Sequence, residues 1–201
     1  MKATGIVRRI DDLGRIVVPK EIRRTLRIRE GDPLEIFTDR EGEIILKKYS
    51  PIGELGNFAQ QYADALTQVN GNIVLVSDKD QFIAAAAGGG TSFAKSNWPG
   101  KRASHQLERA IDERANIAAM KEDRDFIKLS DEAEDNGITW QIIAPIICEG
   151  DAIGSVIILG KDTGKTLTGA SQTRDTGARF GELEIKLAST AATFLGKQME
   201  G

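Results

Sequence analysis

The sequence predicts an α+β protein made of two unlike parts, and three observations lead to this. The first fifty residues contain short β-branched runs separated by turns, with basic side chains among them. The remaining residues alternate apolar runs of strand length with amphipathic segments of helical period. The charge is divided in the same way, since residues 1–50 carry 12 basic and 9 acidic side chains, a balance of +3, whereas the whole chain carries −3. We therefore expect a basic β-rich part followed by an acidic part with an antiparallel sheet and helices.

The overall composition limits the class of protein. A net charge of −3 and a pI near 5.4 argue against a chain that coats nucleic acid without selection. Residues 1–29, however, contain nine basic and three acidic side chains, so a local positive surface is expected. The single Cys148 excludes an intramolecular disulfide, and its apolar neighbours predict a buried, inert thiol. No signal peptide opens the chain and no apolar run reaches membrane-spanning length, so we expect a cytoplasmic protein with no membrane partner.

The first elements are expected to be a strand, a turn, a strand and a short helix. Residues 5–10 and 15–18 are β-branched runs around a turn at residues 11–14, which predicts a hairpin or a strand with a sharp corner. Pro19 suits the first turn of a helix, where no backbone N–H is needed. Ile22 and Leu26 are four residues apart and share one helical face, which leaves the other face basic.

The turn at residues 11–14 has a second copy. A D-x-x-G motif followed by R-I-V-V begins at Asp11, and the same motif followed by E-I-I-L begins at Asp39. Two related hairpins then flank one small helix, and hairpins of this size cannot bury a core alone. We infer an obligate dimer that interleaves two copies. Because Arg15 of the first copy corresponds to Glu43 of the second, one face of this dimer is expected to be strongly positive.

The motifs G-R-I-V-V-P at residues 14–19 and E-I-R-R-T-L at residues 21–26 carry a family resemblance. Residues 1–50 resemble the AbrB-type, swapped-hairpin DNA-binding domain of bacterial transition-state regulators. The resemblance implies a β-barrel dimerisation domain that binds double-stranded DNA in promoter regions, and Arg8 and Arg15 match positions that the family uses on DNA. Arginine presents a planar fork that suits phosphate oxygens and the guanine edge. The candidate DNA-binding residues are Lys2, Arg8, Arg9, Arg15, Lys20, Arg23 and Arg24.

Pro51 and Gly53 interrupt the chain after the basic part, so we expect a linker at residues 51–54 and a second domain at residues 55–201. Apolar periodicity in that domain predicts helices at residues 54–70, 104–120 and 181–199. Apolar runs predict strands at residues 73–76, 82–86, 138–148 and 152–159, and residues 126–129 are a candidate for one more. Residues 160–180 are rich in Gly, Thr, Ser and Asp, which predicts a long loop whose role the sequence does not define.

The pattern A-P-I-x-x-x-G-x-x-I-G-x-V-I-I at residues 144–158 resembles the central hairpin of GAF domains, in which a six-stranded antiparallel sheet carries helices on one side. The whole chain then resembles sporulation regulators that place an AbrB-type domain ahead of a GAF domain. This implies an activator and repressor of late sporulation genes, bound to the nucleoid and active in the forespore. The GAF-like half is implied to sense an unidentified small molecule or to assemble a homotetramer. The apolar faces of the helices predicted at residues 54–70 and 181–199 are consistent either with pairing with a second copy or with packing on their own sheet.

No residue pattern predicts catalysis, a metal or a cofactor. His105 is the only histidine, which excludes the usual zinc spacing, and Gly160 lies one residue too close to Gly164-Lys165-Thr166 for a P-loop. We therefore expect that the protein is not an enzyme. The alternative is an antitoxin-like DNA-binding interaction protein, since the same small fold serves toxin neutralisers. A toxin-binding tail is expected to be disordered, and the periodic apolar C-terminal part argues against one.

Overall fold

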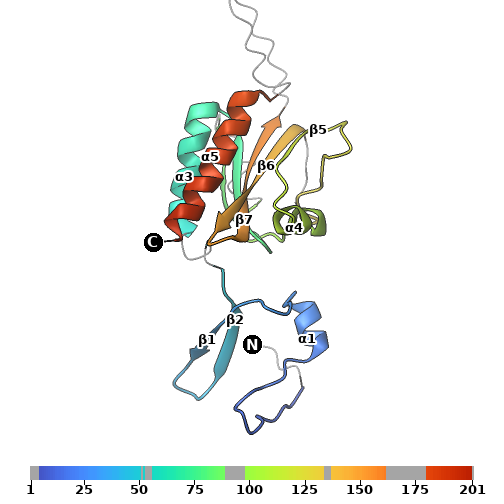
Figure 1. Cartoon of the computed structure of the whole chain (residues 1–201), viewed down its shortest axis with the longest axis vertical. Coiled ribbons are helices and arrows are strands. Elements are labelled where there is room, and N and C mark those ends of the chain that lie inside the picture. The colour runs from blue at the N-terminus through green and yellow to red at the C-terminus, as the bar shows by residue number, and fades with distance from the viewer. Residues whose placement is uncertain are drawn as a thin grey trace, which may run out of the picture. The chain divides into compact units, whose positions relative to one another are not determined.

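The structure is a computed structural model that describes residues 5–50, 52, 56–88, 98–133, 137–161 and 180–200. It divides the chain into two compact units, residues 1–49 and residues 50–201 (Figure 1). None of the helices in the described ranges has the length and apolar character needed to cross a membrane.

The first unit contains one short helix and one hairpin. Helix α1 (Lys20–Thr25) is followed by strands β1 (Leu34–Thr38) and β2 (Ile44–Lys48), which pair antiparallel with Ile36 opposite Leu46. Gly42 in the connecting turn has a φ of +84°, a left-handed conformation that glycine adopts without strain. The second of the two predicted hairpins is therefore confirmed, and the predicted helix begins one residue later than expected because Pro19 caps it.

The first predicted hairpin is not formed as a ladder. Neither residues 5–10 nor residues 15–18 form a strand, although the turn between them closes through hydrogen bonds from Gly14 N to Asp11 O at 2.9 Å and from Asp11 N to Arg15 O at 3.0 Å. A strand needs a neighbouring backbone to pair with, and neither described sheet includes these segments. Val7 and Val17 are 84% and 71% exposed, and no closed barrel forms among the described residues.

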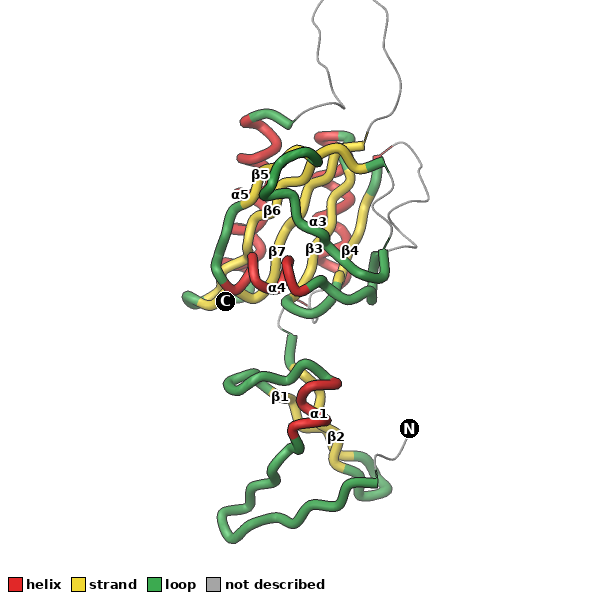
Figure 2. The backbone as a smooth tube through the Cα atoms, turned by 90° about the vertical axis from the view of Figure 1, so that its right-hand side faces the viewer, coloured by secondary structure: helices red, strands yellow, loops and turns green. Residues whose placement is uncertain are grey.

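The second unit is a five-stranded sheet with helices on both faces. Its strands are β3 (Ile73–Asp78), β4 (Phe82–Ala86), β5 (Ile117–Met120), β6 (Ile138–Cys148) and β7 (Asp151–Lys161), in the order β4-β3-β7-β6-β5 with every pair antiparallel. Its helices are α3 (Gly56–Asn70), α4 (His105–Asp112) and α5 (Glu182–Gln198). Figures 1 and 2 show α3 and α5 side by side on one face and α4 across the other.

This arrangement confirms the predicted α+β class with antiparallel sheets and corrects two details. The described sheet has five strands where the family pattern implied six, and α4 lies on the face opposite the other two helices. Residues 126–129 form no strand. The buried Gln141 side chain instead pairs with that segment: in the amide orientation that satisfies both groups, its nitrogen donates to Ile127 O at 3.0 Å and its oxygen accepts from Ile127 N at 2.6 Å.

The helix predicted for residues 104–120 ends early. Ser104 caps α4 by accepting a hydrogen bond from Leu107 N, but the helix stops at Asp112, and Arg114 turns to a φ of +54°. Residues 117–120 then pair with β6 as strand β5. The alanines and isoleucine of this segment fit a helix or a strand by composition, and the unpaired edge of β6 decides in favour of the strand.

Two apolar cores lie on the two faces of this sheet. Small residues of α3 and α5, such as Ala63 and Ala191, let both helices approach the sheet closely on one face, whereas Trp98 and Leu107 fill the other. A side chain at Gly160 would clash with the Trp140 indole, so glycine makes room for that ring. Strand β3 is buried along its whole length, as its continuous apolar run predicts.

Candidate nucleic-acid interface

Six of the seven predicted DNA-binding residues lie in the first unit with exposed side chains, and Lys2 lies outside the described residues. Arg8 and Arg9 precede the turn at residues 11–14, and Arg15 follows it. Helix α1 contains the other three, Lys20, Arg23 and Arg24. The described side chains are thus gathered in two neighbouring stretches of one small unit, residues 8–15 and 20–24.

Helix α1 presents its arginines to solvent. Arg23 and Arg24 occupy its last turn and are exposed, while Ile22 is half-buried. Leu26, which was expected to share a helical face with Ile22, is the C-cap of α1 and is 55% exposed. No ion pair joins Arg9, Lys20, Arg23 or Arg24 to an acidic side chain within the described part of the chain.

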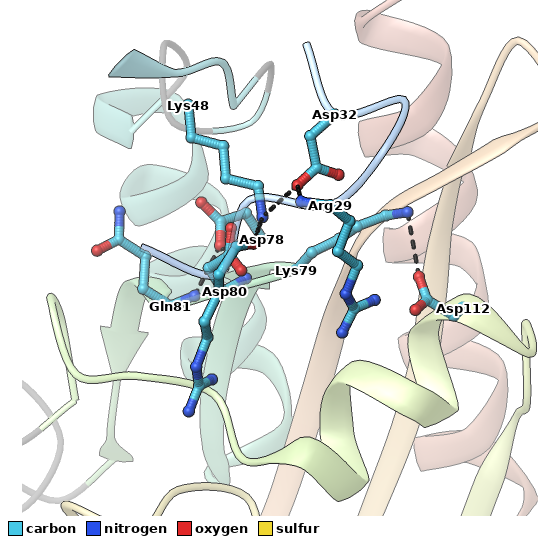
Figure 3. Close-up of polar contacts among 9 residues, drawn as sticks. Arg29, Asp32, Lys48, Asp78, Lys79, Asp80, Gln81 and Asp112 are labelled. Carbon is cyan, nitrogen blue, oxygen red and sulfur yellow. Dashed lines mark hydrogen bonds and ion pairs between the residues drawn. The ribbon is translucent and has the colours of Figure 1, made fainter. Parts of the chain in front are cut away.

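Other basic side chains of the unit are engaged in holding its fold. Lys48 Nζ lies 3.1 Å from Asp32 Oδ2, which also accepts from Arg29 N at 2.8 Å (Figure 3). Lys48 Nζ donates as well to Arg27 O, at 3.1 Å. Lys47 lies over the Phe37 ring, 4.6 Å from its centroid. Arg9, Lys20, Arg23 and Arg24 of the predicted set differ physically from these residues, because their side chains are exposed and form no ion pair with a described acidic side chain.

Arg15 is the member of the set with a defined partner. Its Nε donates to Asp11 Oδ2 at 2.8 Å, and its backbone N donates to Asp11 Oδ1 at 2.8 Å. Leu13 N also donates to Asp11 Oδ1, at 3.1 Å. These donors hold the pKa of Asp11 below its ordinary value, chiefly through the Arg15 backbone N–H and then its guanidinium. Asp11 was predicted only as a turn residue; its spacing of four residues from Arg15 across a turn was the available signal.

The second copy of the turn has the same backbone but the opposite charge. Asp39 Oδ1 accepts from Glu41 N at 3.0 Å and from Glu43 N at 2.9 Å, and Asp39 N donates to Glu43 O at 3.2 Å. Glu43 stands where the first copy has Arg15, so this turn offers no guanidinium. The two turns therefore have matching hydrogen bonds and differ in charge at this position.

The second unit shows no group of three potential metal ligands among its described residues. His105 Nδ1 lies 3.1 Å from the buried carboxylate of Glu108, and Lys79 pairs with Asp112 at 3.1 Å. Cys148 is half-buried rather than fully buried as predicted. Burial raises the pKa of its thiol, and the charges of Glu149, Glu200 and Asp151 raise it further. The Gly164-Lys165-Thr166 run lies outside the described residues.

Comparison with known proteins covers both units. The family described as stage V sporulation protein T C-terminal, transcription factor, matches residues 54–200, and the family described as antidote-toxin recognition MazE, bacterial antitoxin, matches residues 7–54. Stage V sporulation protein T of Bacillus subtilis (strain 168) is 50% identical over 200 residues, which are 100% of this chain and 99% of that protein. Transition state regulatory protein AbrB of the same organism is 51% identical over 75 residues, 37% of this chain and 77% of that protein.

Solved structures similar to this chain match each unit separately. The N-terminal DNA recognition domain of the Bacillus subtilis transition-state regulator AbrB is 65% identical, covers 25% of this chain and 94% of its own, and has a TM-score of 0.22. The PixJ GAF domain of Thermosynechococcus elongatus is 14% identical, covers 76% of this chain and 89% of its own, and has a TM-score of 0.48. The full-length identity and the match at residues 54–200 confirm the predicted resemblance, and the chain belongs to the stage V sporulation protein T family of transcription factors.

Proposed function

We propose that this chain is a DNA-binding regulator that activates and represses late sporulation genes, and that residues 1–50 make the DNA contacts. The observation that carries the assignment is the set of exposed arginines in the first unit, on a chain of a transcription-factor family. Among them, Arg9, Arg23 and Arg24 form no ion pair with a described acidic side chain. The contacting residues are Lys2, Arg8, Arg9, Arg15, Lys20, Arg23 and Arg24.

Most of these contacts go to phosphate oxygens. Such contacts position a protein on the duplex and carry no sequence information by themselves. Selectivity then comes from the few side chains that reach base edges and from the shape and flexibility of the DNA. The regulator acts on the nucleoid in the cytoplasm of the forespore.

The domain organisation follows the same proposal. Residues 1–50 form the DNA-binding and dimerisation domain, residues 51–54 the linker, and residues 55–201 a regulatory and oligomerisation domain. Dimerisation of the first domain is supported by its exposed apolar side chains, among them Val7 and Val17. A homotetramer is supported by Phe194 of α5, which stacks on Phe58 and Tyr62 of α3 yet stays 40% exposed. The regulatory domain holds this assembly together or responds to a small-molecule effector, and it is not an enzyme.

The experiment is a salt titration of promoter DNA with the full chain and the double variant Arg23→Ala/Arg24→Ala. Removing one phosphate-binding cation should lower the slope of log affinity against log salt by roughly one unit. The matched control is Lys121→Ala/Arg124→Ala, which removes two exposed cations from the second unit. The assignment requires a weaker, less salt-dependent complex for the first variant only. An equal slope for both variants would remove α1 from the interface.

The match of residues 7–54 to an antitoxin family is the observation that favours the alternative, an antitoxin-like DNA-binding interaction protein. The C-terminal part speaks against it, because α5 packs buried residues such as Leu195 against the sheet and is no free tail. A toxin that co-purifies with the full chain and is neutralised by it would favour the antitoxin role.

A further inference from the structure

The two D-x-x-G turns of the first unit form a natural comparison, because the chain builds the same turn twice. In both, the aspartate Oδ1 accepts two backbone N–H groups, those of residues 13 and 15 in one and of residues 41 and 43 in the other. In both, the glycine has a positive φ, +76° at Gly14 and +84° at Gly42. One carboxylate oxygen is therefore sufficient for the turn.

The two copies of the turn differ in the contact made by the second carboxylate oxygen of the aspartate. Asp11 Oδ2 accepts from Arg15 Nε at 2.8 Å, whereas Glu43 occupies the equivalent position in the other turn and carries no side-chain donor there. The Asp11–Arg15 pair is not needed to close the turn, since the Asp39 turn closes without one. The turn therefore does not account for this contact, which is made by a candidate DNA-binding arginine.

The geometry of the pair suits an arginine held ready for a ligand. Asp11 binds the Nε–H edge at the base of the guanidinium, and 70% of the Arg15 side chain remains exposed. The two terminal nitrogens can then form the bidentate fork that recognises phosphate or guanine. Anchoring one edge of a long side chain reduces the rotamer freedom that is lost when the fork binds.

We propose that Asp11 is a positioning residue for DNA recognition, which holds the Arg15 guanidinium in one orientation and thereby raises the ratio of specific to non-specific binding. This rests on the proposed function of residues 1–50. The carboxylate also has a cost, since it repels the phosphates near Arg15 and weakens binding that depends on charge alone. Positioning of Arg15 favours binding to specific DNA, whereas repulsion of phosphates weakens binding to non-specific DNA. The proposal therefore predicts that loss of Asp11 lowers the ratio of specific to non-specific affinity.

The test compares Asp11→Asn with its matched control Asp39→Asn in the full chain. Each variant removes one negative charge and keeps one side-chain oxygen for the turn. The probes are a duplex that the wild-type protein selects from a random library and sheared DNA of unrelated sequence. For Asp11→Asn we expect the specificity ratio to fall roughly twofold to fivefold for each protomer, the range set by an exposed ion pair. Asp39→Asn should leave this ratio within experimental error of wild type.

A double-mutant cycle with Arg15→Ala supplies the decisive comparison. In the Arg15→Ala background, Asp11→Asn should cause no further loss of specificity, because the group that Asp11 positions is gone. A further loss of the same size, or equal ratios for the two asparagine variants, would overturn the positioning role. The Arg15 Nε–H resonance in NMR spectra of the free protein should shift in Asp11→Asn and not in Asp39→Asn, which shows the anchor directly.

Failure of the inference can be distinguished from failure of the proposed function. If the wild-type chain binds DNA with a salt dependence that Arg15→Ala reduces, residues 1–50 are the DNA-binding part whatever Asp11 does. If wild-type binding shows no salt dependence and Arg15→Ala leaves it unchanged, the DNA-binding assignment itself is wrong.

Discussion

Asp78 ends strand β3 with its carboxylate almost fully buried, as 6% of the residue is exposed. Oδ1 accepts from the backbone N–H groups of Asp80 and Gln81, both at 2.7 Å (Figure 3). Oδ2 accepts from Ser50 Oγ at 2.8 Å. Burial raises the pKa of Asp78 and the charge of Asp80 adds to this, although the three hydrogen bonds oppose the rise. The Asp78 side chain therefore stabilises the β3–β4 turn through these hydrogen bonds, although its burial disfavours the ionised form.

The sign of the pH effect follows from this raised pKa. A carboxyl group that holds its proton more tightly in the folded state stabilises the fold below its ordinary pKa, and this contribution is lost as pH rises through the folded-state pKa. Asp78→Asn keeps an oxygen for both backbone donors and has no charge to desolvate. We expect the stability of the variant relative to wild type to increase as pH rises above about pH 4, the ordinary pKa of an aspartate.

Urea unfolding followed by tryptophan fluorescence can measure this difference, because both tryptophans, Trp98 and Trp140, lie in the second unit. Asp125→Asn, at an exposed carboxyl group, is the control and should show no such trend. A stability difference between Asp78→Asn and wild type that stays constant as pH rises would show that Asp78 titrates alike in the folded and unfolded chains.

Strand β4 is an edge of the sheet, and α3 covers part of its backbone with one side chain. Gln60 Nε2 donates to Ala85 O at 2.9 Å, and its Oε1 accepts from Ala85 N at 3.2 Å. The Gln60 amide thus makes the two backbone hydrogen bonds with Ala85 that a neighbouring strand would make, as the Gln141 amide does with Ile127. Unpaired backbone groups at the edge of a sheet can pair with strands of other chains. Gln60 links α3 to the sheet and occupies the backbone groups of Ala85 at this edge.

Replacing Gln60 by leucine should remove both hydrogen bonds and destabilise the second unit by about 1–3 kcal/mol. The neighbouring Gln61 is exposed, so Gln61→Leu is a matched control with little expected effect. Amide hydrogen exchange locates the change, since the Ala85 N–H should lose protection in the first variant and keep it in the second. Unchanged protection at Ala85 would mean that the edge is shielded without Gln60.

Each unit of the whole molecule exposes apolar surface that a second copy can cover. In the first unit these side chains belong partly to segments 5–10 and 15–18, which form no strand, and in the second they include Phe194 of α5 and Val69 of α3. Two separate surfaces on one chain can join dimers into a closed tetramer. The units are then expected to contribute different interfaces to the assembly.

Light-scattering mass of the full chain beside a fragment of residues 1–52 measures this. We expect a tetramer for the full chain and a DNA-binding dimer for the fragment, because truncation removes only the second interface. A monomeric or unfolded fragment would contradict the interleaved dimer, and a dimer in both cases would assign the second unit a role other than assembly. Promoter DNA added during a salt titration reports whether the fragment keeps its function.

Features that depend on local pattern could be predicted from the amino-acid sequence alone. The β3–β4 hairpin, the long β6–β7 pair and the final helix follow from apolar period and turn residues, and all three lie where the pattern predicts. The same holds for the exposed arginines of α1, which helical spacing separates from Ile22. Side-chain period and turn chemistry are properties of neighbouring residues, so they can be read without knowing the fold.

Features that depend on a distant partner required the folded chain. Residues 117–120 became a strand because β6 offered them an edge, and residues 126–129 did not because the Gln141 amide took backbone groups of that segment. Residues 5–10 and 15–18, which local pattern predicts as strands, join neither described sheet. The Asp11–Arg15 contact likewise depends on how the turn folds back. Hydrogen-bond partners far apart in the chain outweigh local preference, since a strand exists only where another backbone completes it.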